Sequence, residues 1–373
     1  MTRLHIFPVV LFCILAPGCS IEPPLHLRVK ADTSVILQTE VDLDVLWQVD
    51  WESRWSFNWK PDIYGPLGYE DPASLRLHLY TLDAEGNPKS HTINNFHGTS
   101  SIIPITVGAY DMIFHNNDSE ALRFTDGGTM EDIECYTRVI SSGLKESSSI
   151  LTVEQKADTK SPVEADTLSS EPVILMPDAL FSLYKKGVVI TDNPDDYDYI
   201  NGRYVLRLEG ELTPCTYIHL FQIHLLNNYE RVVGSEGGAA LTGTAPSVNI
   251  VTRFTSDSTA SVPTTVLYDK ETDLMAIRFM TFGLPGCNPY DAASVAASDS
   301  RHFLVINITY FDATWRNIRI DVTDAGRALP LGGVIDLELD VDDFPPDGAI
   351  SGSGFQALID EWEEDYGETT IIN

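Results

Sequence analysis

The stretch "GAYDMIFHNNDSEALRF", Gly108 to Phe124, alternates apolar and polar residues and decides the fold class. Tyr110, Met112 and Phe114 lie two residues apart, so they share one face of a β-strand. The following "HNND" favours a turn, because short Asn and Asp side chains hydrogen-bond the local backbone. The run "ALRF" then resumes the alternation. We therefore expect a β-hairpin whose apolar face fills a core and whose turn is exposed.

Segments of the same kind recur along the chain and are separated by Gly, Pro, Asn and Asp. Examples are "LRLHLYTLD", "YIHLFQIHLL", "LMAIRFMTF" and "FLVINITYF". Short alternating strands with such punctuation are typical of all-β sandwiches. Helical signals are few, and "DALFSLYKKG" fits either a short helix or the entry to a strand. The pattern predicts an all-β protein with two successive β domains of similar size.

Composition suggests where these domains divide. Residues 141–172 are rich in Ser, Lys, Glu, Asp and Thr, which predicts a long mobile loop. "TDNPDDYDYING", Thr191 to Gly202, has the turn chemistry of a connector. We expect an N-terminal β-sandwich over residues 26–195, which contains that loop, and a C-terminal β-sandwich with a terminal tail over residues 196–373.

The tail supports two interpretations. Apolar residues recur at spacings of three and four, as in an amphipathic helix: Phe355, Leu358, Ile359, Trp362 and Tyr366. Phe355, Ala357 and Ile359 also alternate, and the last residues are β-branched, as in a strand. The tail is expected to close the second domain or to extend toward a partner.

The N-terminus has the pattern of a secretory signal. A basic Arg3 precedes the short apolar run "IFPVVLFCILA", and "LAPGC" follows with Cys19 at its end. This ending resembles the lipobox of bacterial lipoproteins. The resemblance implies a signal peptide over residues 1–18, acylation of Cys19 with chains such as palmitate, and a spacer over residues 19–25. The alternative is an ordinary secretory signal with an incidental cysteine.

Charge and hydropathy exclude some classes of binding partner and some kinds of membrane attachment. The 373-residue chain carries a formal charge of −31, which argues against binding nucleic acid, because phosphates would be repelled. No second apolar run approaches the length of a transmembrane helix. The lipid on Cys19 is therefore the expected link to a membrane.

Cysteines are sparse. Beyond the signal and Cys19, the chain holds Cys135, Cys215 and Cys287. An odd number leaves one thiol over if the other two pair. A disulfide between Cys215 and Cys287 is the preferred pairing, because both fall in the second expected domain.

No pattern of residues indicates catalysis. The chain lacks the HExxH, GxSxG and Walker signatures. His219 and His224 are five apart in a strand-like run, so they point to opposite faces. Acidic clusters within residues 192–198 and 340–347 lack the spacing of an EF-hand and are expected to be solvated turns. We expect no enzyme, no metal site and no cofactor, although an unrecognised hydrolase stays open because paired carboxylates can be distant in sequence.

A group of tryptophans near the start offers another kind of site. Trp47, Trp51 and Trp55 are spaced by four, with Trp59 next in the series. Exposed together, such rings could stack on sugars or contact a partner, whereas packing in a core is the commoner role of aromatic side chains. A surface glycan-binding lipoprotein is therefore the alternative function.

Several motifs in order suggest a family. They are "HLRVKAD", "YTLDAEGNP", "IPITVGAYDMIFHNNDSEALRF", "MPDALFSL", "AALTGTAPSVNIV", "GVIDLELDV" and "SGFQALIDEWEEDYGETTIIN". Together they resemble the fimbrial anchor and tip lipoproteins of Bacteroidetes, which are grouped with a closely allied domain of unknown function. Within these motifs, Gly243 and Ala245 fit a place where small residues let chain segments cross.

The resemblance implies two tandem transthyretin-like β-sandwich domains and a lipid anchor in the cell outer membrane, with exposure at the cell surface or in a fimbrium. It also implies a non-catalytic role in pili, as a structural, anchoring or accessory subunit. Subunits in such pili join by donor-strand exchange, in which a segment of one chain completes the sheet of another. The expected partners are therefore other fimbrial subunits.

Overall fold

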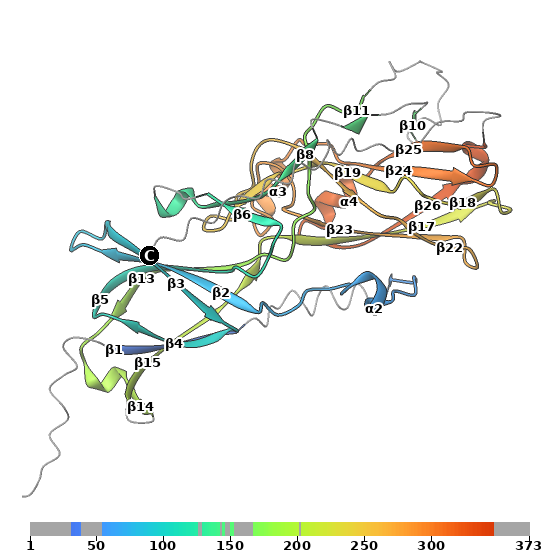
Figure 1. The fold of residues 1–373 in the computed structure, drawn as a ribbon. Helices are drawn as coiled ribbons and strands as arrows, with labels where there is room; N and C mark the ends of the chain where they lie inside the picture. The colour runs from blue at the N-terminus through green and yellow to red at the C-terminus, as the bar shows by residue number, and fades with distance from the viewer. Residues whose placement is uncertain are drawn as a thin grey trace, which may run out of the picture.

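The computed structural model describes residues 31–38, 54–125, 129–141, 144–145, 150–152, 167–200 and 203–346. Cys19, Trp47, Trp51 and the tail from residue 347 lie outside these ranges. The chain is all-β, which confirms the expected fold class (Figure 1). The helices within the described ranges are short: α2 (Pro61–Tyr64), α3 (Ala292–Ala297), α4 (Thr323–Ala328), η2 (Met130–Asp132), η3 (Pro194–Asp196) and η4 (Val341–Asp343).

Two sheets enclose the first core. One has the order β14-β15-β1-β4 and the other the order β16-β13-β5-β2-β3. Leucines of β2, aromatic residues of β5 and isoleucines of β4 meet between them. The strands are β1 (Ala31–Gln38), β2 (Ser74–Leu82), β3 (Pro88–His97), β4 (Ser100–Ile105), β5 (Gly108–Asn116), β13 (Phe181–Ile190), β14 (Asp198–Ile200), β15 (Arg203–Glu211) and β16 (Thr213–Pro214).

The strand β5 confirms the period of the sequence but not the hairpin. Tyr110, Met112 and Phe114 are buried in the core, as the alternation predicts. However, β5 pairs with β2 and β13, whereas β6 (Leu122–Phe124) pairs with β7 (Glu134–Thr137) in a separate three-stranded sheet. The hairpin prediction is wrong because both edges of β5 are already occupied.

The "HNND" run is also less exposed than expected. His115 and Asn116 belong to β5 and are buried. The Asn116 side chain donates to the Ala179 carbonyl at 2.9 Å and accepts from the Phe181 amide at 2.8 Å. These bonds tie the end of β5 to the start of β13, so Asn116 serves a buried junction and not a solvated turn.

A second pair of sheets forms the larger core. One sheet has the order β10-β25-β24-β19-β21-β12-β8, with β18 also on β24, and the facing sheet has the order β22-β23-β17-β26. A three-stranded sheet, β20-β7-β6, and the pair β11-β9 complete the described strands. Their bounds are β8 (Val139–Ser141), β9 (Leu144–Lys145), β10 (Ile150–Thr152), β11 (Thr167–Ser169), β12 (Val173–Ile174), β17 (Tyr217–Leu226), β18 (Val232–Gly234), β19 (Ala239–Thr244), β20 (Ser247–Asn249), β21 (Ala260–Thr264), β22 (Leu267–Asp269), β23 (Leu274–Thr281), β24 (Phe303–Tyr310), β25 (Trp315–Asp321) and β26 (Gly333–Asp340).

The two halves of the chain interlock. The early strands β8, β10 and β12 pair into the sheet that contains β19, β24 and β25. The later strands β14 and β15 pair into the sheet that contains β1. The division expected between residues 195 and 196 stays a prediction, but strands of the first sheet continue to Glu211.

The segment that begins at residue 54 lies across the second pair of sheets and leads from there into β2 of the first pair. In Figure 1 it carries α2 along the β17 sheet, on the side away from β24. Leu67 and Tyr69 pack against apolar residues on that face, together with Trp55 and Trp59. Tyr69 Oη donates to the Thr216 carbonyl at 2.7 Å, and Arg278 Nε donates to the Leu67 carbonyl at 2.9 Å.

Two further expectations can be placed. "DALFSLYKKG" leads into β13, so the strand interpretation is confirmed. Within residues 141–172, the described pieces include the short strands β9, β10 and β11, and the mobility of that loop stays a prediction.

Candidate functional site

Of the three tryptophans proposed as contacts, Trp55 lies within the described ranges. Its ring is half-buried against the β17 sheet and lies 6.3 Å from the ring of Phe57. The adjacent Ser56 amide donates to Gln222 Oε1 at 2.9 Å, which fixes the backbone beside it. In the structure, Trp55 therefore takes part in packing between two parts of the same chain.

The three described cysteines are free thiols, so the expected Cys215–Cys287 disulfide is not formed. The two side chains lie in different apolar clusters. Cys215 Sγ is 3.1 Å from Ser182 Oγ, and Cys287 Sγ donates to the Leu284 carbonyl at 3.3 Å. Burial raises the pKa of Cys215 and raises that of Cys287 to about 11, so neither thiol is activated as a nucleophile.

His219 and His224 both lie on β17. His219 is buried, and its Nε2 is 3.0 Å from the Leu329 carbonyl; burial lowers its pKa. Within the described ranges, no group of three or more His, Cys, Asp or Glu side chains is placed to hold a metal ion. In the same ranges, no helix is long and apolar enough to cross a bilayer.

A chain of three histidines was missed from the sequence. His91 Nε2 lies 3.1 Å from His78 Nδ1, and His78 Nε2 lies 3.1 Å from His115 Nε2. His115 Nδ1 lies 2.7 Å from the Asn116 carbonyl, which can only accept. His115 Nδ1 must therefore donate, so His115 Nε2 accepts from His78, and His78 Nδ1 accepts from His91. In this arrangement each ring of His78 and His115 donates through one nitrogen and accepts through the other, so both are neutral.

The three histidines become progressively more buried from β3 to β5. His91 is exposed on β3, His78 is 8% exposed on β2, and His115 is fully buried on β5. Burial lowers the pKa of His115 to about 3. The three residues are far apart in sequence and meet through the register of β3, β2 and β5. These hydrogen bonds link the exposed strand β3 to the interior at β5.

The strand β3 offers a surface for pairing. Among the described residues it pairs only with β2 and ends its sheet. It is ten residues long, and its first six side chains are exposed, on both faces of the strand. Lys89 is the one Lys, Arg, Asp or Glu in "PKSHTINNFH". A long edge with so little charge is a template for another strand.

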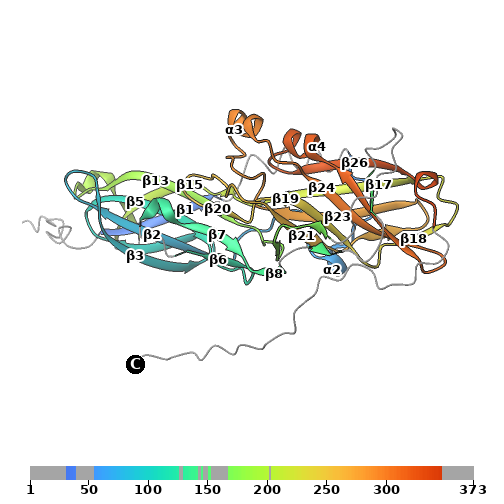
Figure 2. The same ribbon diagram turned by 90° about the horizontal axis from the view of Figure 1, so that it is seen from above.

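The opposite end of the molecule carries a second surface, which we call the loop end. Figures 1 and 2 place β3 at one end of the molecule and β18 at the other. The loop end consists of residues 226–231, 311–314 and 340–344. These connect β17 to β18, connect β24 to β25, and follow β26. The Phe311 amide donates to the Arg231 carbonyl at 2.9 Å, which joins the first two segments.

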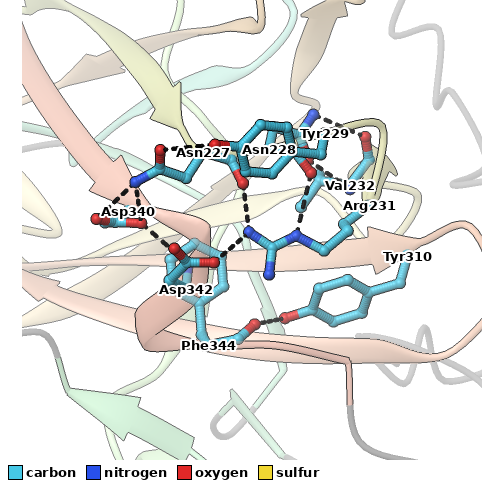
Figure 3. A network of polar contacts seen from close by, with 9 residues as sticks. All are labelled: Asn227, Asn228, Tyr229, Arg231, Val232, Tyr310, Asp340, Asp342 and Phe344. Atoms are coloured by element: carbon cyan, nitrogen blue, oxygen red, sulfur yellow. Dashed lines mark hydrogen bonds and ion pairs between the residues drawn. The ribbon is translucent and has the colours of Figure 1, made fainter.

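Hydrogen bonds hold the loop end in one shape (Figure 3). Arg231 Nη2 donates to Asp342 Oδ1 at 2.6 Å and also to the Asn227 carbonyl. Asn227 Nδ2 donates to both Asp340 carboxylate oxygens at 3.1 Å. Asn228 is buried, and its side chain accepts from the Val232 amide at 2.7 Å. The loops are therefore braced against the strands that they connect.

The backbone of this end is unusual. Among the described residues, six residues other than glycine have a positive φ. Five of them lie at the loop end or in the adjoining β22–β23 turn: Asn227, Tyr229, Glu230, Asp273 and Ala313. Such conformations cost free energy and persist only where surrounding contacts enforce them, and they concentrate at functional sites. The sequence signal was the run "NNYE", because Asn tolerates this conformation better than most residues.

Two solved structures are similar to this chain over most of its length. A protein described as a "putative adhesin" from Bacteroides ovatus is 15% identical, with 86% of this chain and 94% of that chain covered and a TM-score of 0.49. The fimbrial anchor protein Mfa2 from Porphyromonas gingivalis is 13% identical, with 83% and 90% covered and a TM-score of 0.40. No protein of curated function matches the chain.

One family model matches the sequence itself. The match covers residues 54–265, which is more than half of the chain, and the family is described as a domain of unknown function, DUF5119. The matched residues include β2 to β21 and therefore strands of both cores. This confirms the resemblance to an allied domain of unknown function. The chain belongs to the DUF5119 family.

Proposed function

We propose that this chain is a non-catalytic accessory or anchoring subunit of fimbriae, attached to the outer membrane by lipid on Cys19 and exposed at the cell surface. Family membership, the lipobox-like "LAPGC" and the all-β fold support this proposal. The observation that carries it is the edge strand β3, because fimbrial subunits join by adding a strand to an exposed sheet edge.

The geometry of β3 suits strand addition. Its outer edge presents backbone N–H and C=O groups that a partner strand can pair, while alternate side chains set the register. Ile93 is 47% exposed and offers an apolar contact beside that edge. Pro88 and Lys89 disfavour pairing with another strand, but only at the first two positions of β3. The partner in this proposal is an extended segment of another fimbrial subunit.

The experiment measures pairing directly. The anchored chain is expressed with an affinity tag, and the major fimbrial subunit of the same cells is captured and quantified from outer-membrane extracts. Thr92→Lys together with Ile93→Lys puts charge on both faces of β3, which disfavours edge pairing. We expect capture of the subunit to fall at least tenfold with little change in thermal stability, because both side chains are on the surface.

Ile63→Lys is the matched control, because Ile63 is 67% exposed on α2 and lies away from β3. It should leave capture unchanged. Undiminished capture by the β3 variant would show that this edge does not join subunits. Failure of the parent chain to capture any fimbrial subunit would count against the fimbrial role itself.

A further inference from the structure

The loop end exposes two large aromatic side chains. Tyr229 is 78% exposed and Phe311 is 65% exposed, whereas the core-facing aromatic residues of this half are buried. Leu226, 41% exposed, adds a third apolar side chain on the same loop as Tyr229. Exposed aromatic side chains grouped on one surface are a common mark of an interaction site.

Neighbouring groups hold the Tyr229 ring in place. Its hydroxyl donates to Asn227 Oδ1 at 3.4 Å, and the Arg231 guanidinium carbon lies 5.8 Å from the ring centroid (Figure 3). The backbone beneath it is fixed by the bonds of Arg231 and Asn228 described above. An aromatic ring that is exposed yet held loses little conformational entropy when a partner covers it.

Charge identifies the kind of partner. Four exposed carboxylates belong to the loop end: Glu230, Asp312, Asp342 and Asp343. Arg231, the basic residue of these segments, is paired with Asp342. The surface is therefore acidic, and the faces of aromatic rings also attract cations.

The same charge argues against two other occupants. The chain's own tail, residues 347–373, contains seven Asp and Glu residues and no Lys or Arg. A second copy carries the same charge of −31. Both would be repelled by the acidic loop end.

We propose that the loop end docks a basic segment of a partner protein, with Lys or Arg side chains seated on Tyr229 and Phe311 and paired with the surrounding carboxylates. This surface is distinct from the β3 edge and lies at the other end of the molecule. The chain would thus hold one partner by backbone pairing at β3 and another by cation recognition at the loop end.

The test distinguishes the contribution of the two aromatic rings to binding from that of the net negative charge of the protein. Binding of a synthetic peptide of alternating Arg and Gly is measured by calorimetry on the soluble chain that begins after Cys19. Tyr229→Ala with Phe311→Ala keeps the net charge and should weaken binding roughly 5- to 30-fold, as expected for two exposed cation–π contacts. Tyr229→Phe with Phe311→Tyr keeps both rings and should bind as the parent does.

The matched control removes two exposed aromatic side chains elsewhere, Tyr199 and Phe254, which are 68% and 48% exposed. Tyr199→Ala with Phe254→Ala should leave affinity unchanged. Equal weakening in both double variants, or none in either, would show that only bulk charge attracts the peptide and would overturn the proposal. Binding of starch or mannan that is lost only in the Tyr229/Phe311 variant would also overturn it, because the surface would then recognise sugar.

Discussion

Acid should destabilise this protein through His115, because the folded state cannot accommodate an imidazolium there. His115 is fully buried at the end of the His91–His78–His115 chain, and its Nε2 accepts a hydrogen bond in the neutral arrangement. Burial holds its pKa at about 3, compared with about 6.5 for an unperturbed histidine. Between these two values the unfolded chain binds a proton that the folded chain does not. Stability is therefore complete above about pH 6.5 and falls as the pH drops toward 3.

The size of the effect follows from the shift. Each pH unit below the unfolded pKa costs about 1.4 kcal/mol while the folded ring stays neutral. At pH 5, one and a half units below that pKa, His115 should lower the free energy of unfolding by about 2 kcal/mol. Burial also lowers the pKa of His302, to about 4. Its protonation in the unfolded chain should add a similar loss of unfolding free energy per pH unit below about pH 6.5.

Urea unfolding followed by circular dichroism at pH 7 and pH 5 measures the difference. His115→Gln keeps a donor and an acceptor but removes the titrating ring, so the variant should lose about 2 kcal/mol less than the parent between the two pH values. His97→Gln, at the exposed end of β3, controls for the loss of one imidazole. If parent and His115→Gln lose the same free energy of unfolding, the buried ring does not cause the acid sensitivity.

Three further predictions concern other parts of the chain. Cys19→Ala should shift the protein from the membrane fraction to the soluble fraction or block its processing; identical fractionation and N-terminal mass would contradict lipidation. Leu77→Ala, at a fully buried position of β2, should lower the free energy of unfolding by about 2–5 kcal/mol in urea titrations, whereas Ile63→Ala on the surface should change it by less than about 0.5 kcal/mol. Ellman's reagent should find no reactive thiol among Cys135, Cys215 and Cys287 until urea unfolds the chain, because all three are buried; rapid labelling of the native protein would show that these sites open.

The faces of the strands could be predicted from the sequence, but their pairing could not. Alternation is a local property, so the buried face of β5 follows from Tyr110, Met112 and Phe114 alone. Pairing depends on segments far along the chain, and β13 and β2 occupy the edges that a hairpin would have needed. The family resemblance did predict one non-local contact correctly, the close crossing of chain segments at Gly243. Gly243 has a φ of +76°, and a Cβ there would lie 2.1 Å from the Arg301 carbonyl oxygen, so only glycine fits this crossing.

The candidate surfaces were harder to predict for the same reason. From the sequence, Tyr229 and Phe311 would be assigned to a core, since aromatic side chains are buried more often than not. The structure instead places each of them in an exposed loop between two strands. His78, His91 and His115 lie far apart in the sequence, so their contact could not be predicted without the register of β3, β2 and β5. The tryptophans could not be distinguished as a platform or as packing, because the spacing of four fits both.

The parallel pairing of β1 with β15 constrains how the chain is made. β1 lies between β4 and β15, and its register runs from Asp32 opposite Val205 to Gln38 opposite Glu211. A chain that emerges N-terminus first must hold β1 with one open edge until β15 arrives, and such late, distant pairing slows folding and exposes aggregation-prone edges. An N-terminal fragment that ends at residue 195 would never receive this strand. Such a fragment should accumulate as insoluble material, so a recombinant fragment that contains the first core must extend through Pro214.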